Sequence, residues 1–357
     1  MAVLRVVLDQ VNDVIDADQA EAARALVSGL AATAPHKCTV EAIVPGGGSD
    51  PVVEGADSVH RLTLPRRELG AAWQLGVIAG VGGGMIHAPS LFAPLAKHDR
   101  ANDYDQTVAT VWDLRPWTAP EQLTRAGVLW QRGMLKRAVK HADAVIVPTH
   151  AMAERLAGLG RFGDRIRVIP GAAAGGFAIP PDAPRRRVAL GAAGRYIVGT
   201  GTAGELGPVF AAAVDARADA FVLDAPDGAA PAIAEAAAAA GLSAPHVHVP
   251  ARLDAQDRAA LLGGALAFVA ADPAQVWPWR LVEALTVGVP VIAADGGVHR
   301  DVLADGGLLV AADGFTDALR DAAGEGARRL SVLAADRSRA YSWHSSAERV
   351  WTLHAEL

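Results

Sequence analysis

The sequence predicts an α/β protein made of two domains, each built around a parallel β-sheet. Short apolar runs alternate with longer segments of helical periodicity along the chain, as expected for strands joined by crossover helices. The length of 357 residues is enough for two ordinary domains. A proline-rich segment over residues 176–187 has the composition of a linker. We therefore expect domains at residues 1–175 and 188–339, followed by a last helix over residues 340–357.

Apolar runs bounded by turn residues predict the strands of the first domain, at residues 4–8, 40–44, 85–88, 107–114, 144–148 and 165–170. Helical periodicity places helices at 18–32 and 122–141. Three prolines in the linker favour extended backbone there and disfavour a helix. In the second domain the strands are predicted at residues 196–199, 220–223, 246–249, 267–270, 289–293 and 308–310, with helices between them.

Composition excludes several classes of protein. Hydrophobic residues make up 51% and charged residues 20% of the chain, so it can bury a large core and is not globally disordered. The net charge of -6, with both signs interspersed, argues against a nucleic-acid groove or a polybasic membrane patch. No apolar run reaches the roughly 18 residues of a membrane span. A single cysteine, Cys38, excludes an intramolecular disulfide and fits a cytoplasmic location.

One segment of the second half carries the sharpest resemblance to a known family. It begins at Gln275, reads Gln-Val-Trp-Pro-Trp-Arg-Leu-Val-Glu-Ala through Ala284, with Glu283 as its acidic residue, and continues as Gly-Val-Pro-Val from Gly288. This resembles the donor-site signature of the family-4 glycosyltransferases, Glu-Gly-Phe-Gly-Leu-Pro-x-x-Glu-Ala followed by Gly-x-Pro-Val-x-Ala. Other segments match the family in the same order, at residues 86–89, 110–116, 142–149, 167–171, 296–310 and 341–343.

The resemblance implies the GT-B fold, with two Rossmann-like domains facing across a cleft and the last helix crossing back to the first domain. It also implies transfer of a sugar, with retention, from a nucleotide diphosphate sugar to a glycan or small-molecule acceptor. Neither a metal nor a cofactor is expected. The donor lies mostly on the second domain, where its phosphates need positive charge and backbone N–H groups.

By this resemblance, the donor-binding candidates are Glu283, Gln275, Arg280, Gly199 and Thr200. Glu283 corresponds to the residue that holds the ribose hydroxyls, although a carboxylate favoured by a helix start explains it as well. Arg280 can supply a positive charge for phosphate, or it belongs to an interdomain ion pair or stacks on Trp277 or Trp279. Gln275 and His87 are the catalytic candidates, and His87 is more simply a structural histidine.

Several positions depart from the family pattern. Residues 10–19 contain no glycine where the family has a glycine loop beside the phosphates. Thr200 and Glu205 stand at the positions of the phosphate-binding Arg and Lys, and a carboxylate there repels phosphate. Trp112 replaces a sugar-contacting His, and Pro278 replaces a glycine and removes an N–H group.

Aromatic residues gather on the segments expected to line the cleft. The chain has 8 Trp against 3 Tyr. Trp112, Asp113 and Arg115 belong to the first-domain segment, and Trp277 and Trp279 to the second. These indoles either stack on a sugar or base, or fill an unused pocket or partner interface.

Three functions remain open at this point. The first is a glycosyltransferase homologue with a degenerate donor site, either non-catalytic or dependent on a catalytic partner. The second is an active retaining glycosyltransferase in a rearranged site that uses Glu283, Gln275 and Arg280. The third is a dinucleotide-dependent oxidoreductase, suggested by Gly199-x-Gly-x-x-Gly and an acidic residue, Asp224, about 20 positions on. Against the third, Pro208 is expected to interrupt the helix that this motif should open.

Overall fold

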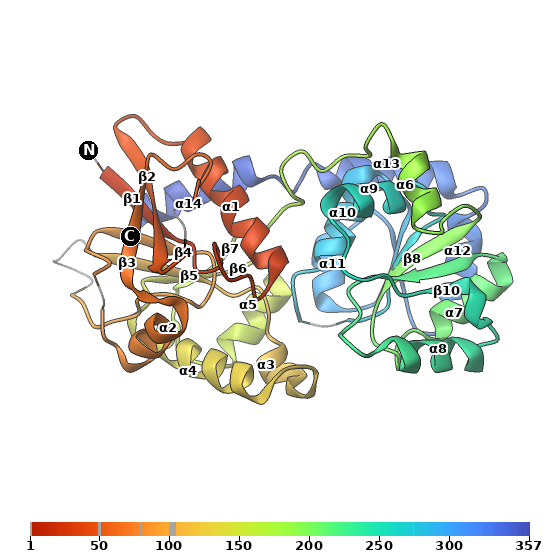
Figure 1. Cartoon of the computed structure of the whole chain (residues 1–357), viewed down its shortest axis with the longest axis horizontal. Coiled ribbons are helices and arrows are strands. Elements are labelled where there is room, and N and C mark those ends of the chain that lie inside the picture. Colours follow the sequence, from red (N-terminus) through yellow and green to blue (C-terminus); the bar gives the residue numbers. More distant parts are fainter. Residues whose placement is uncertain (1, 49–50, 79, 100–104, 274) are drawn as a thin grey trace. The chain divides into compact units, whose positions relative to one another are not determined.

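The computed structural model describes residues 2–48, 51–78, 80–99, 105–273 and 275–357, and it divides into two compact units (Figure 1). Unit 1 comprises Met1–Ala172, Gln275–Trp277 and Ser342–Leu357, and unit 2 comprises Ala173–Ala274 and Pro278–Tyr341. The segment Gln275–Trp277 therefore groups with unit 1, although the boundaries expected from the sequence put it in the second domain.

Unit 1 is a doubly wound α/β structure around a parallel sheet. Its strands are β1 (Ala2–Val7), β2 (Cys38–Gly46), β3 (Ser58–Pro65), β4 (Met85–Ala88), β5 (Gln106–Thr110), β6 (Ala144–Val147) and β7 (Ile166–Val168). Its helices are α1 (Ala17–Ala32), α2 (Arg66–Leu75), α3 (Arg115–Thr118), the 3₁₀ turn η1 (Pro120–Gln122), α4 (Arg125–His141), α5 (His150–Ala157) and α14 (Trp343–Glu356). In Figure 1 the sheet lies between α1 and α14 on one side and α2 and α4 on the other.

The strands of unit 1 follow the order β3-β2-β1-β4-β5-β6-β7. Leu4 of β1 pairs with Val40 on one side and with Met85 on the other, both in parallel. The strand order therefore reverses between β1 and β4. In open α/β sheets, ligands bind beyond the carboxyl ends of the strands at such a switch point.

Unit 2 repeats this architecture. Its strands are β8 (Tyr196–Thr200), β9 (Asp219–Val222), β10 (Val247–His248), β11 (Phe268–Ala270), β12 (Val291–Ala294) and β13 (Leu308–Val310), in the spatial order β10-β9-β8-β11-β12-β13. Its helices are α6 (Ala183–Ala189), α7 (Gly207–Ala216), α8 (Ala230–Ala239), the 3₁₀ turn η2 (Ala244–His246), α9 (Ala255–Leu262), α10 (Trp279–Val287), α11 (Gly297–Leu303), α12 (Phe315–Ala322) and α13 (Ala327–Ser338). The switch point lies between β8 and β11.

The closing helix α14 packs on unit 1 through specific polar contacts as well as apolar ones. The hydroxyl of Ser342 caps its first turn by accepting from the amide of Ser345. The indole N–H of Trp351 donates to the carbonyl of Leu30 on α1 at 3.0 Å, and the Ser346 hydroxyl donates to the carbonyl of Pro170 at 2.7 Å. These bonds join the two ends of the chain within one unit.

Some predicted elements differ from those observed. The strand expected at 107–114 ends at Thr110, because Asp113 leaves the sheet and pairs in antiparallel fashion with Val276. The end of the expected linker is helical, since Pro184 occupies the first turn of α6, where a missing N–H costs nothing. Pro208 takes the same position in α7, so the expectation that it interrupts this helix is wrong.

Both β3 and α2 were missed by the sequence analysis. The strand β3 lies at the edge of the sheet, and most of its side chains are at least partly exposed. An edge strand of this kind lacks the continuous apolar run that revealed the central strands.

Candidate functional site

The loop after β1 uses its own side chains to satisfy its amide groups. The side-chain carbonyl of Gln10 accepts hydrogen bonds from the amides of Ile15 and Asp16, at 2.9 and 2.6 Å. The carboxylate of Asp16 then caps α1 by accepting from the amides of Asp18 and Gln19, both at 3.1 Å. These are the N–H groups that a helix start would otherwise offer to an anion, so an internal carboxylate occupies this position.

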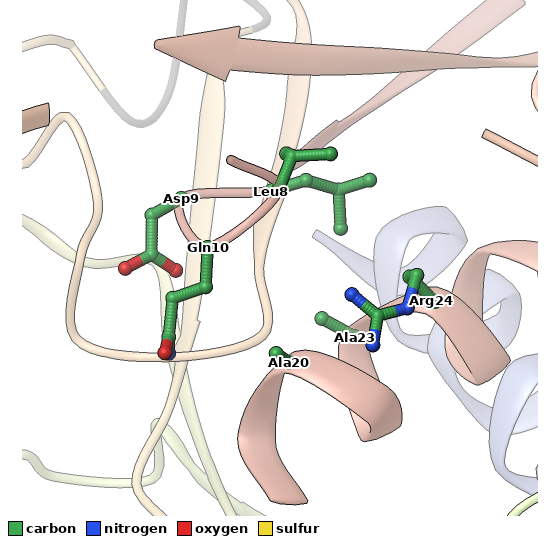
Figure 2. A pocket seen from close by; sticks show the side chains of 7 residues that line it. Leu8, Asp9, Gln10, Ala20, Ala23 and Arg24 are labelled. Carbon is green, nitrogen blue, oxygen red and sulfur yellow. The ribbon is translucent and has the colours of Figure 1, made fainter. Parts of the chain in front are cut away.

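A small pocket opens beside this loop (Figure 2). Its walls are formed by the end of β1, the loop that follows and the first turns of α1, through Leu8, Asp9, Gln10, Val11, Ala20, Ala23 and Arg24. Figure 2 shows Gln10 on the loop side and Arg24 on the helix side of this space. Leu8, Ala20 and Ala23 make much of the lining apolar, and the exposed Arg24 adds a positive charge.

Asp9 is a buried acid at the carboxyl end of β1 that the sequence analysis did not single out. Its carboxylate accepts two hydrogen bonds from the guanidinium of Arg66, at 2.7 and 3.0 Å. Burial raises the pKa of Asp9, and the neighbouring Arg66 partly opposes this effect. Arg66 in turn lies over the ring of Phe92 at 5.1 Å from its centroid. The only available signal was a polar residue directly after an apolar strand, which is too common to identify a site.

His87 lies on β4 and is fully buried against α14. The side-chain oxygen of Gln106 accepts from Nδ1 of His354 at 3.0 Å, so Nε2 of the neutral His354 is left to accept from Nδ1 of His87 at 3.4 Å. Burial lowers the pKa of His354 to about 4. Burial and the nearby His354 hold the pKa of His87 well below its usual value. His87 thus belongs to the packing of the last helix, in line with the structural role considered from the sequence.

Three tryptophans form a buried cluster inside unit 1. Trp112 follows β5, and its ring centroid lies 6.3 Å from that of Trp277 and 6.4 Å from that of Trp343. The indole N–H of Trp112 donates to the carbonyl of Pro89 at 2.7 Å. Gly171 lies so close that a Cβ there would be 3.0 Å from Nε1 of Trp277. Trp112 and Trp277 are 5% and 1% exposed, so these two indoles fill space in the interior of the unit.

Backbone hydrogen bonds hold the Gln275–Trp277 segment in this position. The amide of Leu114 donates to the carbonyl of Gln275 at 2.8 Å, and the amide of Trp277 donates to the carbonyl of Trp112 at 2.9 Å. Asp113 and Arg115 flank the same stretch and form a bidentate ion pair with each other, with a shortest distance of 2.8 Å. The guanidinium of Arg115 is therefore engaged by a carboxylate of its own segment.

In unit 2, the glycine-rich turn after β8 is closed by an acidic side chain. Thr200 is the last residue of β8. The carboxylate of Glu205 accepts from both the amide and the hydroxyl of Thr202, each at 2.8 Å. Gly199 packs against the neighbouring strand, where a Cβ would lie 3.2 Å from the carbonyl oxygen of Val269. As at α1, a carboxylate of the chain bonds the donors that an incoming phosphate would need.

Glu283 lies on α10 and is buried beneath two arginines. One of its carboxylate oxygens accepts from Arg258 and from Arg280, each at 2.7 Å. Arg258 also donates through Nε to both oxygens at 3.1 Å. The three side chains are only 3–6% exposed. Nε of Arg280 donates to the carboxylate of Asp224, just beyond β9, at 2.8 Å.

The structure thus brings some predicted site residues together and separates others. Glu283 and Arg280 belong to one ionic network, and the ion pairs of Arg280 lie within unit 2, whereas the pair considered from the sequence was interdomain. Trp112, Asp113, Gln275 and Trp277 meet in unit 1. Trp279 is a half-buried residue of unit 2. His299 lies on the helix α11, where it is buried and bonds the carbonyl of Ala294.

The described residues contain no group of three or more His, Cys, Asp or Glu side chains arranged to hold a metal ion. In the same part of the chain, none of the helices combines the length and the apolar character required to cross a membrane.

Comparison with known proteins gives matches among solved structures alone. No family model matches the chain, and no curated protein sequence matches it. A sucrose-phosphate synthase from Thermosynechococcus elongatus is 19% identical, with a TM-score of 0.71 over 100% of this chain and 99% of that one. The Anabaena protein HepE in complex with UDP-glucose is 15% identical, with a TM-score of 0.69 over 99% and 100% of the two chains.

The catalytic domain of starch synthase IV from Arabidopsis thaliana, bound to ADP and acarbose, is 14% identical, with a TM-score of 0.66 over 100% of this chain and 99% of that one. At such low identity these likenesses establish the fold. Two Rossmann-like units with parallel sheets, matched over their full length by glycosyltransferases of this architecture, give the chain the GT-B fold.

Proposed function

We propose that this chain is a glycosyltransferase-class protein of sugar transfer or glycan assembly whose nucleotide-sugar site is degenerate. In this proposal it is non-catalytic by itself or depends on a catalytic partner subunit. The ligand class, a nucleotide diphosphate sugar, rests on the UDP-glucose, UDP and ADP complexes among the similar structures. A glycan or a small molecule would be the acceptor.

The observation that carries this proposal is the state of the Glu283 carboxylate. In the family that the sequence resembles, this residue holds the ribose hydroxyls of the donor. Here the carboxylate is 4% exposed and bonded by the guanidinium groups of Arg258 and Arg280. A ribose would have to reach a buried group and compete with charge-assisted hydrogen bonds, which are among the strongest in proteins.

The phosphate-binding positions support the same proposal. Thr200 offers no positive charge, and Glu205 brings a negative one to the turn where the family has a lysine. The cations that stand in the donor segment are already neutralised, since Arg280 pairs with Glu283 and Asp224. A diphosphate approaching this turn would therefore meet the carboxylate of Glu205, while the guanidinium of Arg280 is already paired with carboxylates.

Calorimetric titration tests the proposal. UDP, ADP and UDP-glucose are titrated into the wild-type protein and into Glu283→Ala, with the exposed Glu235→Ala of the same unit as a matched control. We expect no saturable binding tighter than about 1 mM, which corresponds to about 4 kcal/mol, and no release of UDP from UDP-glucose. Circular dichroism establishes that each variant is folded before it is titrated.

The opposite result would favour the second function. Binding at or below about 1 mM that disappears in Glu283→Ala but persists in Glu235→Ala would mean that unit 2 still binds a donor and that this binding depends on Glu283. The chain would then be an active retaining glycosyltransferase with a rearranged site. The similar structures described above give no support to an oxidoreductase, and tight binding of NAD would be needed to revive that alternative.

A further inference from the structure

The ionic network of unit 2 runs outward from the core in alternating charges. Arg258 bonds Glu283, Glu283 bonds Arg280, and Arg280 bonds Asp224. The first three side chains are 6%, 5% and 3% exposed, whereas the side chain of Asp224 is 38% exposed. Asp224 is therefore the member of this network that meets solvent, and the others hold it in place.

Asp224 stands where a ligand of this fold would be bound. It follows β9 at the carboxyl edge of the sheet, and the preceding residue, Leu223, donates its amide to the carbonyl of Gly199 at 2.9 Å. Arg280 lies in the first turn of α10, the helix that follows β11. The Arg280–Asp224 pair thus links segments that follow β9 and β11, the two neighbours of β8, at the switch point of the sheet.

The backbone at Asp224 is unusual as well. Its φ is +55°, in the left-handed region that few residues other than glycine adopt, with aspartate among the commoner exceptions. Such a backbone conformation is maintained where several surrounding interactions hold it in place. The bond from the buried Arg280 to Oδ2 is one such interaction, and it fixes the direction in which the carboxylate points.

The chemistry of Asp224 suits a hydroxyl ligand. Arg280 bonds Oδ2, and within the described part of the chain no hydrogen bond to Oδ1 is present. An ionised carboxylate has about four acceptor sites, so Asp224 keeps the capacity to accept from two adjacent hydroxyl groups. Glu205 lies in the turn that follows β8, the strand next to β9, and adds a second negative charge to the carboxyl edge of this sheet, which disfavours an anionic group and favours a neutral one.

We propose that Asp224, held by the Arg258–Glu283–Arg280 network, is the carboxylate of unit 2 that binds a neutral vicinal diol. In this arrangement Glu283 acts as a positioning residue. The diol would come either from the ribose of a nucleoside or from a pyranose sugar. The inference rests on the proposed function for the class of ligand, and it moves the hydroxyl-binding role from Glu283 to Asp224.

Ligand-observed NMR on the full chain tests this with two probes, uridine and methyl α-glucoside, which distinguish the two sources. The 2′,3′-dideoxy analogue of uridine controls for the diol. The variant is Asp224→Asn, and the matched control is Asp227→Asn, an exposed aspartate three residues further along the same loop. We expect one of the two probes to bind with a millimolar Kd. If that probe is uridine, its dideoxy analogue should bind at least tenfold more weakly. The substitution Asp224→Asn should weaken binding of the probe tenfold or more.

Three results would overturn the inference. The first is no saturation of the protein with either probe at about 50 mM. The second is equal binding of uridine and its dideoxy analogue by the wild-type protein, and the third is an equal loss of probe binding in Asp224→Asn and Asp227→Asn. These results are separable from those of the donor-site test. Tight binding of UDP-glucose that is lost in Asp224→Asn would sink the degenerate-site proposal and support this one. Absence of all binding would leave the degenerate-site proposal standing and remove this one.

Discussion

The imidazoles of His87 and His354 are held inside unit 1 in their neutral form, and this has consequences for stability. Each ring is surrounded by protein and bonds the other, and His354 also bonds Gln106. A proton added to either ring would bring a buried charge into this contact without a counterion in it. Because charging a buried group is costly, acid should weaken the attachment of α14 to β4.

The pKa of His354 sets the direction in which the free energy of unfolding changes with pH and the pH range over which it changes. Its folded value is lowered to about 4 from the ordinary 6.5, so between these values the unfolded chain binds the additional proton. Neutral His354 makes its full contribution to the free energy of unfolding above pH 6.5, and this contribution is lost as the pH falls towards 4. The full loss amounts to roughly 3 kcal/mol, at 1.36 kcal/mol per pKa unit.

We expect the variant His354→Gln to lose this part of the pH dependence. Urea unfolding at pH 7, 5.5 and 4.5 measures it, with His344→Gln as the control, since His344 is an exposed histidine on the same helix. Burial raises the pKa of Asp9, so Asp9 changes the pH dependence of stability in the opposite direction. This effect cancels in the comparison because the wild type and both variants contain Asp9. A slope in His354→Gln as steep as in the wild type would contradict the assignment.

At the scale of elements, the segment after β11 is informative because its neighbouring tryptophans have different surroundings. Trp277 is packed against Trp112 and close to Gly171, whereas Trp279 begins α10 and is half-buried. Two residues apart in the sequence, they belong to different compact units.

Truncating Trp277 should therefore open a cavity in unit 1. We expect Trp277→Ala to cost about 3–5 kcal/mol, the usual range for a buried Trp, as measured by urea unfolding followed by circular dichroism. Trp279→Ala is the matched control and should cost clearly less. If the two variants lost the same stability, Trp277 would not be the core residue that its burial indicates.

The loops that precede α1 and α7 both satisfy their own backbone or hydroxyl donors with an acidic side chain. In each, an acidic side chain of the loop bonds the donors that an anion would use: Asp16 at α1 and Glu205 at the turn before α7. These bonds stabilise the turns without a ligand.

At the scale of the whole molecule, the first and last helices of the chain, α1 and α14, pack against each other within unit 1. Gly29 on α1 lies against α14, where a Cβ would be 2.8 Å from the backbone oxygen of Trp343. Replacing a helical glycine by alanine normally stabilises a helix by about 0.5–1 kcal/mol. At this contact a methyl group would force two helices apart, because the obstructing atom belongs to backbone.

We therefore expect Gly29→Ala to destabilise the protein, by about 1–3 kcal/mol as for other overpacked sites. Thermal unfolding followed by circular dichroism measures the change. Ser28→Ala, the neighbouring position on the same helix, should have a small effect. A higher melting temperature in Gly29→Ala would show that α1 and α14 are less tightly packed than the structure indicates.

Most of the fold was predictable because it depends on local patterns. Buried parallel strands read as short apolar runs, so the strand sites from β1 to β13 were found, apart from the polar edge strand β3. Helix α14 was found from its periodicity, and the order of motifs predicted the two-unit architecture. The site was less predictable, since Arg258, which bonds Glu283, and Asp224, which bonds Arg280, lie at positions that no spacing rule connects to Glu283.

The sequence by itself predicted two domains with parallel sheets and, through its resemblance, the GT-B fold, and it determined which residue types stand at the expected donor site. Only the tertiary structure decided what those residues touch. It placed Glu283 under two arginines, left Asp224 at the sheet edge and buried Trp277 against Trp112. Charge pairing and burial depend on segments far apart in the chain, and folding alone brings these together.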